Sequence, residues 1–184
     1  MKSWLRNAAR TGLTAVDSAY RRRHRLQPVG PVLYVARARY PGPAMTFADG
    51  TRIAAGDEYG ALHFDNSRIA ALGEGSRVRT GVRFARLLRD SLRDLAAATR
   101  EDPALRDLPV FHGVTWIREH GDRVGFVSEP LPTGPRRRLL GAHFRMLRWV
   151  FAPSLRTSTT GAPEPRLFWL TRADLLANFG QGRQ

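Results

Sequence analysis

The sequence predicts an α+β fold with an antiparallel-dominated sheet flanked by helices, preceded by an N-terminal amphipathic helix. Strand-like and helix-like segments come in blocks rather than in strict alternation, which is typical of this class. The length of 184 residues suits one domain with an appendage. Hydrophobic residues make up 42% and charged residues 25% of the chain, as in soluble globular proteins. We therefore expect an appendage at 1–27 and a single domain at 28–184.

The appendage is predicted from residues 3–20, in which apolar side chains recur at helical spacing. We expect two faces, an apolar half that includes Val16 and Tyr20 and a polar half that includes Asp17 and Arg21. The basic run 21-RRRHR-25 ends the helix. Pro28 and the dipeptide 30-GP-31 then indicate a linker.

The first part of the domain predicts a β-meander. Residues 32–40 form a β-branched and aromatic run that is typical of a strand. Residues 44–48 and 51–53 predict a hairpin, because 49-DG-50 supplies the turn between them. Residues 59–64 predict a further short strand.

Two helices are expected next. A short helix at 67–72 is capped by Asn66 or Asp65, because either side chain accepts a bond from a free helix N–H. A longer helix at about 78–99 has an apolar stripe that predicts its buried face, consisting of Phe84, Leu88, Leu92 and Leu95.

The last part of the chain predicts strands and helices in turn. Residues 109–117 and 123–128 are expected to pair as a hairpin. An amphipathic helix follows at 136–151, and a last strand at 166–170. A terminal helix at 172–179 is predicted to start at Thr171 as N-cap and to end at Gly180.

Positive charge is concentrated on two segments. The chain has a formal net charge of +14, and Lys2 is the only lysine among its 30 basic residues. Residues 1–25 hold seven basic side chains and one acid, and residues 136–156 hold six and none. The remainder is nearly balanced. This distribution favours a polyanionic partner such as a phospholipid surface, an anionic glycan or nucleic acid.

Several classes of site are excluded or disfavoured. The chain contains no cysteine, which excludes disulfides, thiolate metal sites and a cysteine nucleophile. No Gly-x-Ser-x-Gly elbow, Walker A loop or Gly-x-Gly-x-x-Gly fingerprint is present. No apolar run approaches the ~20 residues that span a bilayer. We expect no cofactor, no metal, and a cytoplasmic location that includes peripheral binding at the inner face of the membrane.

The order of short motifs resembles the YkoP-like domain of bacteria, an uncharacterised family. The resemblance extends over nearly the whole chain and depends on 49-DGTRI-53, 62-LHFDN-66, 113-GVTW-116, the basic helix and 168-FWLTRADLL-176. It implies a domain that occurs alone or beside polysaccharide deacetylases, and so a link to cell-envelope carbohydrate or lipid metabolism. It implies no catalytic role for any residue.

The candidate site lies where the strand at 59–64 ends. His63 and Asp65 share one face of this strand, and with Asn66 they would hold an anion or perform acid/base chemistry. His112 would join them if the two strands are neighbours. Thr115 is a further candidate ligand-binding residue. The alternative is that both histidines are structural and that Asn66 is an ordinary helix cap.

The basic helix at 136–151 carries arginines opposite its apolar face, a pattern that is typical of an interfacial membrane helix. The candidate anion-binding side chains are Arg137, Arg138, Arg145 and Arg148. The alternative is a helix that covers the sheet with its apolar face. We therefore expect an accessory protein that binds an anionic membrane surface or a lipid-linked sugar phosphate. The other candidates are a transferase or hydrolase of envelope glycans with His63 as acid/base, and a nucleic-acid-binding module.

Overall fold

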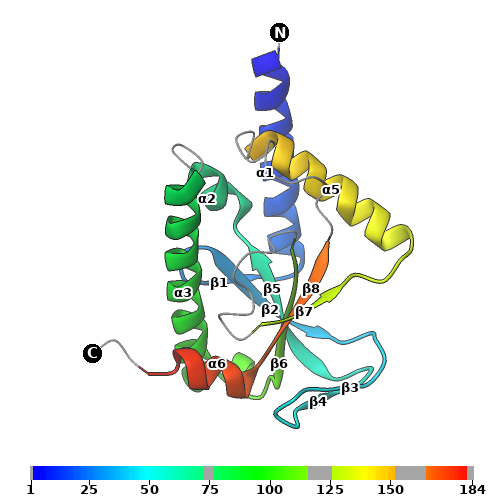
Figure 1. The fold of residues 1–184 in the computed structure, drawn as a ribbon, viewed down its shortest axis with the longest axis vertical. Coiled ribbons are helices and arrows are strands. Elements are labelled where there is room, and N and C mark those ends of the chain that lie inside the picture. The colour runs from blue at the N-terminus through cyan, green and yellow to red at the C-terminus, as the bar shows by residue number, and fades with distance from the viewer. Residues whose placement is uncertain (1, 73–76, 116–125, 152–164, 182–184) are drawn as a thin grey trace.

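The computed structural model describes residues 2–72, 77–115, 126–151 and 165–181 (Figure 1). Their helices are α1 (Lys2–Arg23), α2 (Asn66–Ala71), α3 (Arg77–Glu101), α4 (Pro103–Arg106), α5 (Pro135–Phe151) and α6 (Arg172–Phe179). Their strands are β1 (Gln27–Val29), β2 (Leu33–Arg39), β3 (Met45–Thr46), β4 (Arg52–Ile53), β5 (Glu58–Phe64), β6 (Val110–Thr115), β7 (Val127–Pro130) and β8 (Arg166–Thr171).

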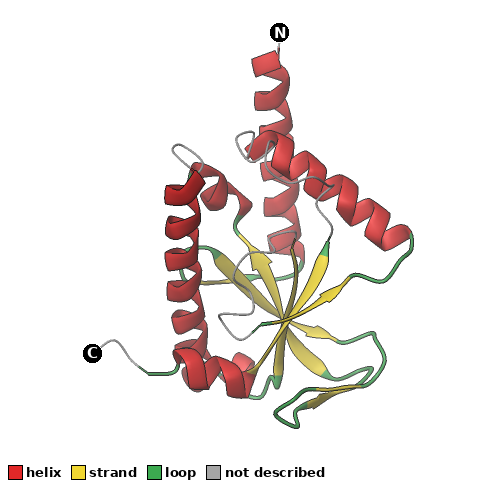
Figure 2. Cartoon of the chain, viewed as in Figure 1, coloured by secondary structure: helices red, strands yellow, loops and turns green. Residues whose placement is uncertain are grey.

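The main sheet has the strand order β1-β2-β5-β6-β8-β7. Every neighbouring pair is antiparallel except β5 and β6, which run parallel. Helices lie on both sides of these strands, which confirms the predicted α+β class (Figure 2). The β3–β4 hairpin is a separate two-stranded sheet, and Gly50 in its turn has a φ of 84°, which favours glycine.

One face of the sheet packs against α3 and α6. Leu33 and Val35 of β2 meet Leu92 and Leu95 of α3, all with almost no exposed surface. This contact confirms the C-terminal half of the apolar stripe that the sequence predicts for α3. Phe111 of β6 lies in the same core, and it explains the glycine opposite it, because a Cβ on Gly60 would overlap the Phe111 ring.

The other face is covered by α1, α5 and the β3–β4 hairpin (Figure 1). The hairpin buries Phe47 and Ile53 against Trp169 of β8. Helix α1 contacts both α5 and α2, and its Leu13 is buried. The C-terminal half of α1 therefore lies over the sheet of the domain.

The predicted pairing of 109–117 with 123–128 is wrong. Strand β8 lies between β6 and β7 and pairs with both of them, so these two strands are not neighbours. The physical reason is the composition of β8, in which Phe168, Trp169 and Leu170 are all buried. A strand that is apolar on both faces belongs inside a sheet, whereas β7, with Ser128 and Glu129, suits an edge.

Helix boundaries follow the predicted caps. The Thr171 hydroxyl accepts a hydrogen bond from the backbone N–H of Asp174 at 3.1 Å, and Gly180 ends α6, as predicted. Asp65, rather than Asn66, caps α2, because its carboxylate accepts a bond from the Arg68 N–H at 2.9 Å. Residues 27–29, predicted as part of a linker, form the edge strand β1.

Candidate functional site

A cluster of charged and polar side chains lies between α1 and the end of β5. His63 of β5 points to the face that α1 covers, and its Nε2 lies 2.9 Å from Oδ1 of Asp17 on α1. The Tyr20 ring lies 5.2 Å from the His63 ring, measured between centroids. The Asp17 side chain is only 10% exposed and that of His63 is 30% exposed. The structure thus gives His63 a carboxylate partner that the sequence analysis did not identify.

Arg21 extends this cluster to β2 and to Asp65. Its Nη1 donates a hydrogen bond to the Tyr34 hydroxyl at 3.1 Å and lies 3.5 Å from both the Asp17 and the Asp65 carboxylates. The Tyr34 hydroxyl in turn donates to Asp65 at 3.3 Å. Oδ2 of Asp17 accepts no hydrogen bond from the described residues, so the nearby Arg21 charge is what compensates its burial. We call Asp17, Arg21, Tyr34, His63 and Asp65 the polar cluster.

The polar cluster changes the predicted orientation of the C-terminal part of α1, whereas Leu13 of the predicted apolar half is buried. The sequence places Asp17 and Arg21 on the outer half of the helix and Val16 and Tyr20 on the inner half. In the structure Asp17 and Arg21 face the sheet, while Val16 is 62% exposed and Tyr20 is also exposed. The reason is the surface beneath α1, where Tyr34, His63 and Asp65 offer ionic and hydrogen-bonding partners to polar side chains.

Helix α5 brings a second histidine to the cluster. His143 is half-buried, and this burial lowers the pKa of its imidazole because it disfavours the charged form. The charge of His63 lowers this pKa further, and that of Asp17 opposes the change. The sequence contains a signal for His143, because it is a polar residue within the apolar arc of the helix at 136–151. Among the described residues, no group of three His, Asp or Glu side chains is arranged to hold a metal ion.

His112 lies on the same sheet face, on the strand next to β5, with other partners. Its register partner on β5 is Ala61, two residues before His63. Its Nδ1 lies 3.2 Å from the Phe168 carbonyl oxygen, and its ring stacks on Trp169 at 3.9 Å. Burial is the main cause that lowers the His112 pKa to about 4. The charge of Arg136 also lowers this pKa, whereas the hydrogen bond to the Phe168 carbonyl raises it, and the ring is neutral at pH 7.

The other two candidate ligand-binding positions in this region are Asn66 and Thr115. Asn66 is the first residue of α2 and is half-buried. Thr115 is buried on β6 and lines a cavity between the sheet and α3, on the face opposite to His63. The structure therefore connects His63 to Asp65 through Asp17 and Arg21, and it leaves Thr115 on the other side of the sheet.

The predicted cationic side chains lie on helices α1 and α5, which contact each other. On α5, Arg138 and Arg145 are exposed and Arg137 is half-buried, whereas the Arg148 side chain lies outside the described residues. Arg22, Arg23 and Arg25 at the end of α1 are exposed too. Large apolar side chains are exposed on the same two helices, namely Val16, Tyr20, Leu139 and Met146.

The apolar face of α5 is only partly used for packing. Phe144 is buried, but Leu139 is 72% exposed and Met146 is also exposed. Among the side chains that the structure describes, the helix therefore buries Phe144 of its predicted apolar arc and presents Leu139 and Met146 to solvent. We call the exposed arginines and apolar side chains of α1 and α5 the cationic surface. No helix among the described residues has both the length and the apolar character needed to span a bilayer.

The model of the YkoP domain family matches residues 6–179 of the chain. The chain belongs to the YkoP domain family. The match includes most of α1, so the YkoP domain as matched contains the helix that carries Asp17 and Arg21. Neither a curated protein nor a solved structure matches the chain. Within this YkoP domain, the polar cluster and the cationic surface contain several of the residues that the sequence predicts for a site.

Proposed function

We propose that this YkoP domain binds the surface of an anionic membrane through the cationic surface of α1 and α5. The observation that supports the proposal is the contact between these two helices, each of which carries most of one basic segment of the sequence. Exposed arginines attract lipid phosphates, and exposed apolar side chains next to them enter the interfacial region. Helix α5 has both kinds of group, because the exposed Leu139 directly follows Arg138 in its sequence.

The composition of the outer surface supports a membrane more than a nucleic acid. Docking to DNA or RNA phosphates needs positive charge but gains nothing from exposed aliphatic side chains such as Leu139 and Val16. An interfacial membrane helix needs both. A lipid-linked sugar phosphate, as implied by a link to cell-envelope metabolism, would present its phosphate at the same surface. The inner leaflet of the cell membrane is the anionic surface that fits a cytoplasmic protein.

Vesicle sedimentation tests the proposal with two charge-matched variants. Arg138→Glu/Arg145→Glu changes two exposed arginines of α5, and Arg83→Glu/Arg86→Glu changes two exposed arginines of α3 on the other side of the sheet. Each basic residue near an anionic membrane contributes about 1 kcal/mol, so the α5 variant should lose at least about 2 kcal/mol, or about 30-fold in affinity for phosphatidylglycerol vesicles. The α3 variant should bind like the unmodified protein.

Equal losses in the two variants would show that net charge alone drives binding, and absence of binding to anionic vesicles at low salt would refute the proposal. A duplex DNA of the same phosphate concentration serves as competitor. Displacement of the protein from vesicles by this DNA at equal phosphate would favour the nucleic-acid-binding alternative.

A second candidate function is acid/base catalysis on envelope glycans, with His63 as the base. Its support is the 2.9 Å contact with Asp17, because a general base needs an imidazole that a neighbouring group holds in a fixed orientation. Hydrolysis or transfer of glycan fragments by the protein should then fall at least 100-fold in both His63→Gln and Asp17→Asn. Activity that persists in His63→Gln would exclude this role, and Arg83→Gln, at an exposed position of α3, serves as the surface control.

A further inference from the structure

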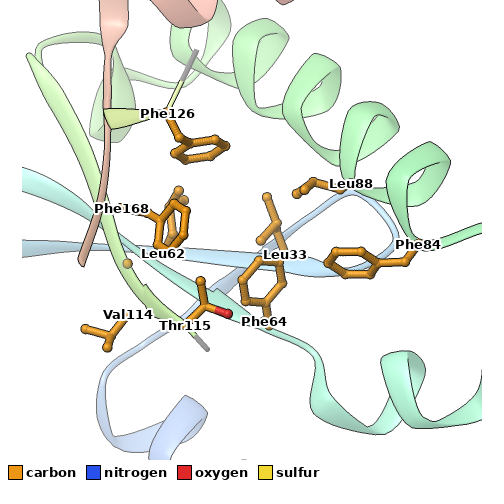
Figure 3. A pocket seen from close by; sticks show the side chains of 10 residues that line it. Leu33, Leu62, Phe64, Phe84, Leu88, Val114, Thr115, Phe126 and Phe168 are labelled. Atoms are coloured by element: carbon orange, nitrogen blue, oxygen red, sulfur yellow. The ribbon is translucent and has the colours of Figure 1, made fainter. Parts of the chain in front are cut away.

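A cavity lies on the opposite side of the sheet from the polar cluster and the cationic surface. It has a volume of about 50 Å³ and lies between the sheet and the N-terminal half of α3 (Figure 3). One water molecule needs about 10–15 Å³ in this measure, so the space is several times larger than a water site. The figure shows side chains of β2, β5, β8 and α3 around this space, with Phe126 on one side.

The cavity exists because α3 packs tightly along only half of its length. Leu92 and Leu95, in the C-terminal half, are completely buried against the sheet. Phe84 and Leu88 belong to the same apolar stripe, but both are only half-buried and line the cavity. The sequence pattern predicts all four as core residues. The N-terminal half of the stripe therefore keeps apolar surface in contact with the cavity and with solvent.

The lining is almost wholly apolar. Its side chains include those of Leu33, Leu62, Phe64, Phe84, Leu88 and Phe168, and Thr115 carries the one hydroxyl of the described lining residues. Two aromatic contacts border the space, because Phe64 and Phe84 lie 5.8 Å apart and Phe126 and Phe168 lie 6.1 Å apart between ring centroids. Among the described residues, no charged side chain and no side-chain amide lines it, so the matching ligand is an uncharged hydrocarbon.

We propose that this cavity binds the end of a single hydrocarbon chain, with the polar part of the ligand outside. The small volume of the cavity supports one chain rather than a fused ring system. The half-buried state of Leu62, Phe64, Phe84 and Leu88 shows that the space is accessible from outside. Binding would remove their remaining apolar surface from water, which is the driving force. The proposal is independent of membrane docking, because the two surfaces lie on opposite faces of the sheet.

Methyl NMR with neutral alcohols tests this proposal without vesicles. We expect 1-octanol to cause saturable shifts of the Leu33, Leu62 and Leu88 methyl signals, while the exposed Leu139 stays unchanged. In a series of straight-chain alcohols, affinity should rise about fourfold for each added methylene until the cavity is full. Geraniol, a branched isoprenoid alcohol, distinguishes the source of the chain. Tighter binding of geraniol than of 1-decanol indicates an isoprenoid ligand, and the reverse indicates an acyl ligand.

A filled cavity provides the matched variant. Leu88→Trp should reduce 1-octanol affinity at least tenfold, and Val82→Trp, at an exposed position of the same helix, should leave it unchanged. Leu62→Phe fills the space from the sheet side if the first variant does not fold. The proposal would be overturned if the unmodified protein shows no shifts, shifts that do not saturate, or shifts centred on Leu139. It would also be overturned if a folded variant with a filled cavity binds 1-octanol as tightly as the unmodified protein.

Discussion

Arg21→Ala should destabilise the protein far more than a surface arginine substitution does. Arg21 is only 19% exposed and lies between the Asp17 and Asp65 carboxylates, which are 10% and 7% exposed. Removing one partner from a buried ionic network costs about 3–5 kcal/mol, because the opposite charges stay buried. Arg68 still lies 3.6 Å from Asp65 and compensates part of its charge, so we expect the lower end, about 3 kcal/mol.

Urea unfolding and calorimetry measure this effect. For a chain of this size, a loss of about 3 kcal/mol lowers Tm by about 6–12 °C. The neighbouring Arg22→Ala is the control, because Arg22 is exposed and should change the unfolding free energy by less than about 0.5 kcal/mol. If the two variants unfold alike, Arg21 does not hold α1 on the sheet, and the description of the polar cluster is incorrect.

Three further predictions follow from buried positions. The pKa of His112 is about 4 in the folded protein and about 6.5 in the unfolded chain, so the unfolded chain binds more protons between these pH values. The free energy of unfolding should therefore fall by about 3 kcal/mol as the pH drops from 6.5 to 4. Urea titrations at several pH values should lack this loss in His112→Gln, and an unchanged pH dependence in that variant would contradict the prediction. Gly60→Ala should lower stability by about 1–3 kcal/mol, because its Cβ overlaps the Phe111 ring, and an unshifted urea midpoint would refute that overlap. Thr171→Ala removes the N-cap of α6 and should cost about 1 kcal/mol by the same assay, whereas Thr171→Ser should cost much less if capping is the cause.

The sequence predicts local structure well because local structure depends on neighbours in the chain. Apolar spacing predicts α3 and α5, and short polar side chains predict caps that the structure places at Asp65 and Thr171. The 49-DG-50 turn predicts the β3–β4 hairpin in the same way. In each case the stabilising contact lies within a few residues of the signal.

The errors arise where a distant segment decides the outcome. Two strand-like segments that follow each other in the sequence predict a hairpin of β6 and β7. In the structure β8, which begins about 40 residues after β7, lies between them and pairs with both. The amphipathic pattern of α1 likewise predicts that Asp17 faces solvent. This pattern contains no information about the polar residues beneath α1. His63, Tyr34 and Asp65 come from other elements and reverse that preference. The sequence thus identifies His63 as a candidate but cannot supply its partner.

The most direct test of membrane docking uses one fluorescent label at a time. The chain has no cysteine, so Leu139→Cys on α5 and Val82→Cys on α3 each create a unique site for an environment-sensitive dye, and both positions are highly exposed. On addition of phosphatidylglycerol vesicles, the label at 139 should shift its emission to the blue, while the label at 82 keeps its aqueous spectrum. Unchanged emission at 139, or the same shift at both positions, would contradict binding through the cationic surface.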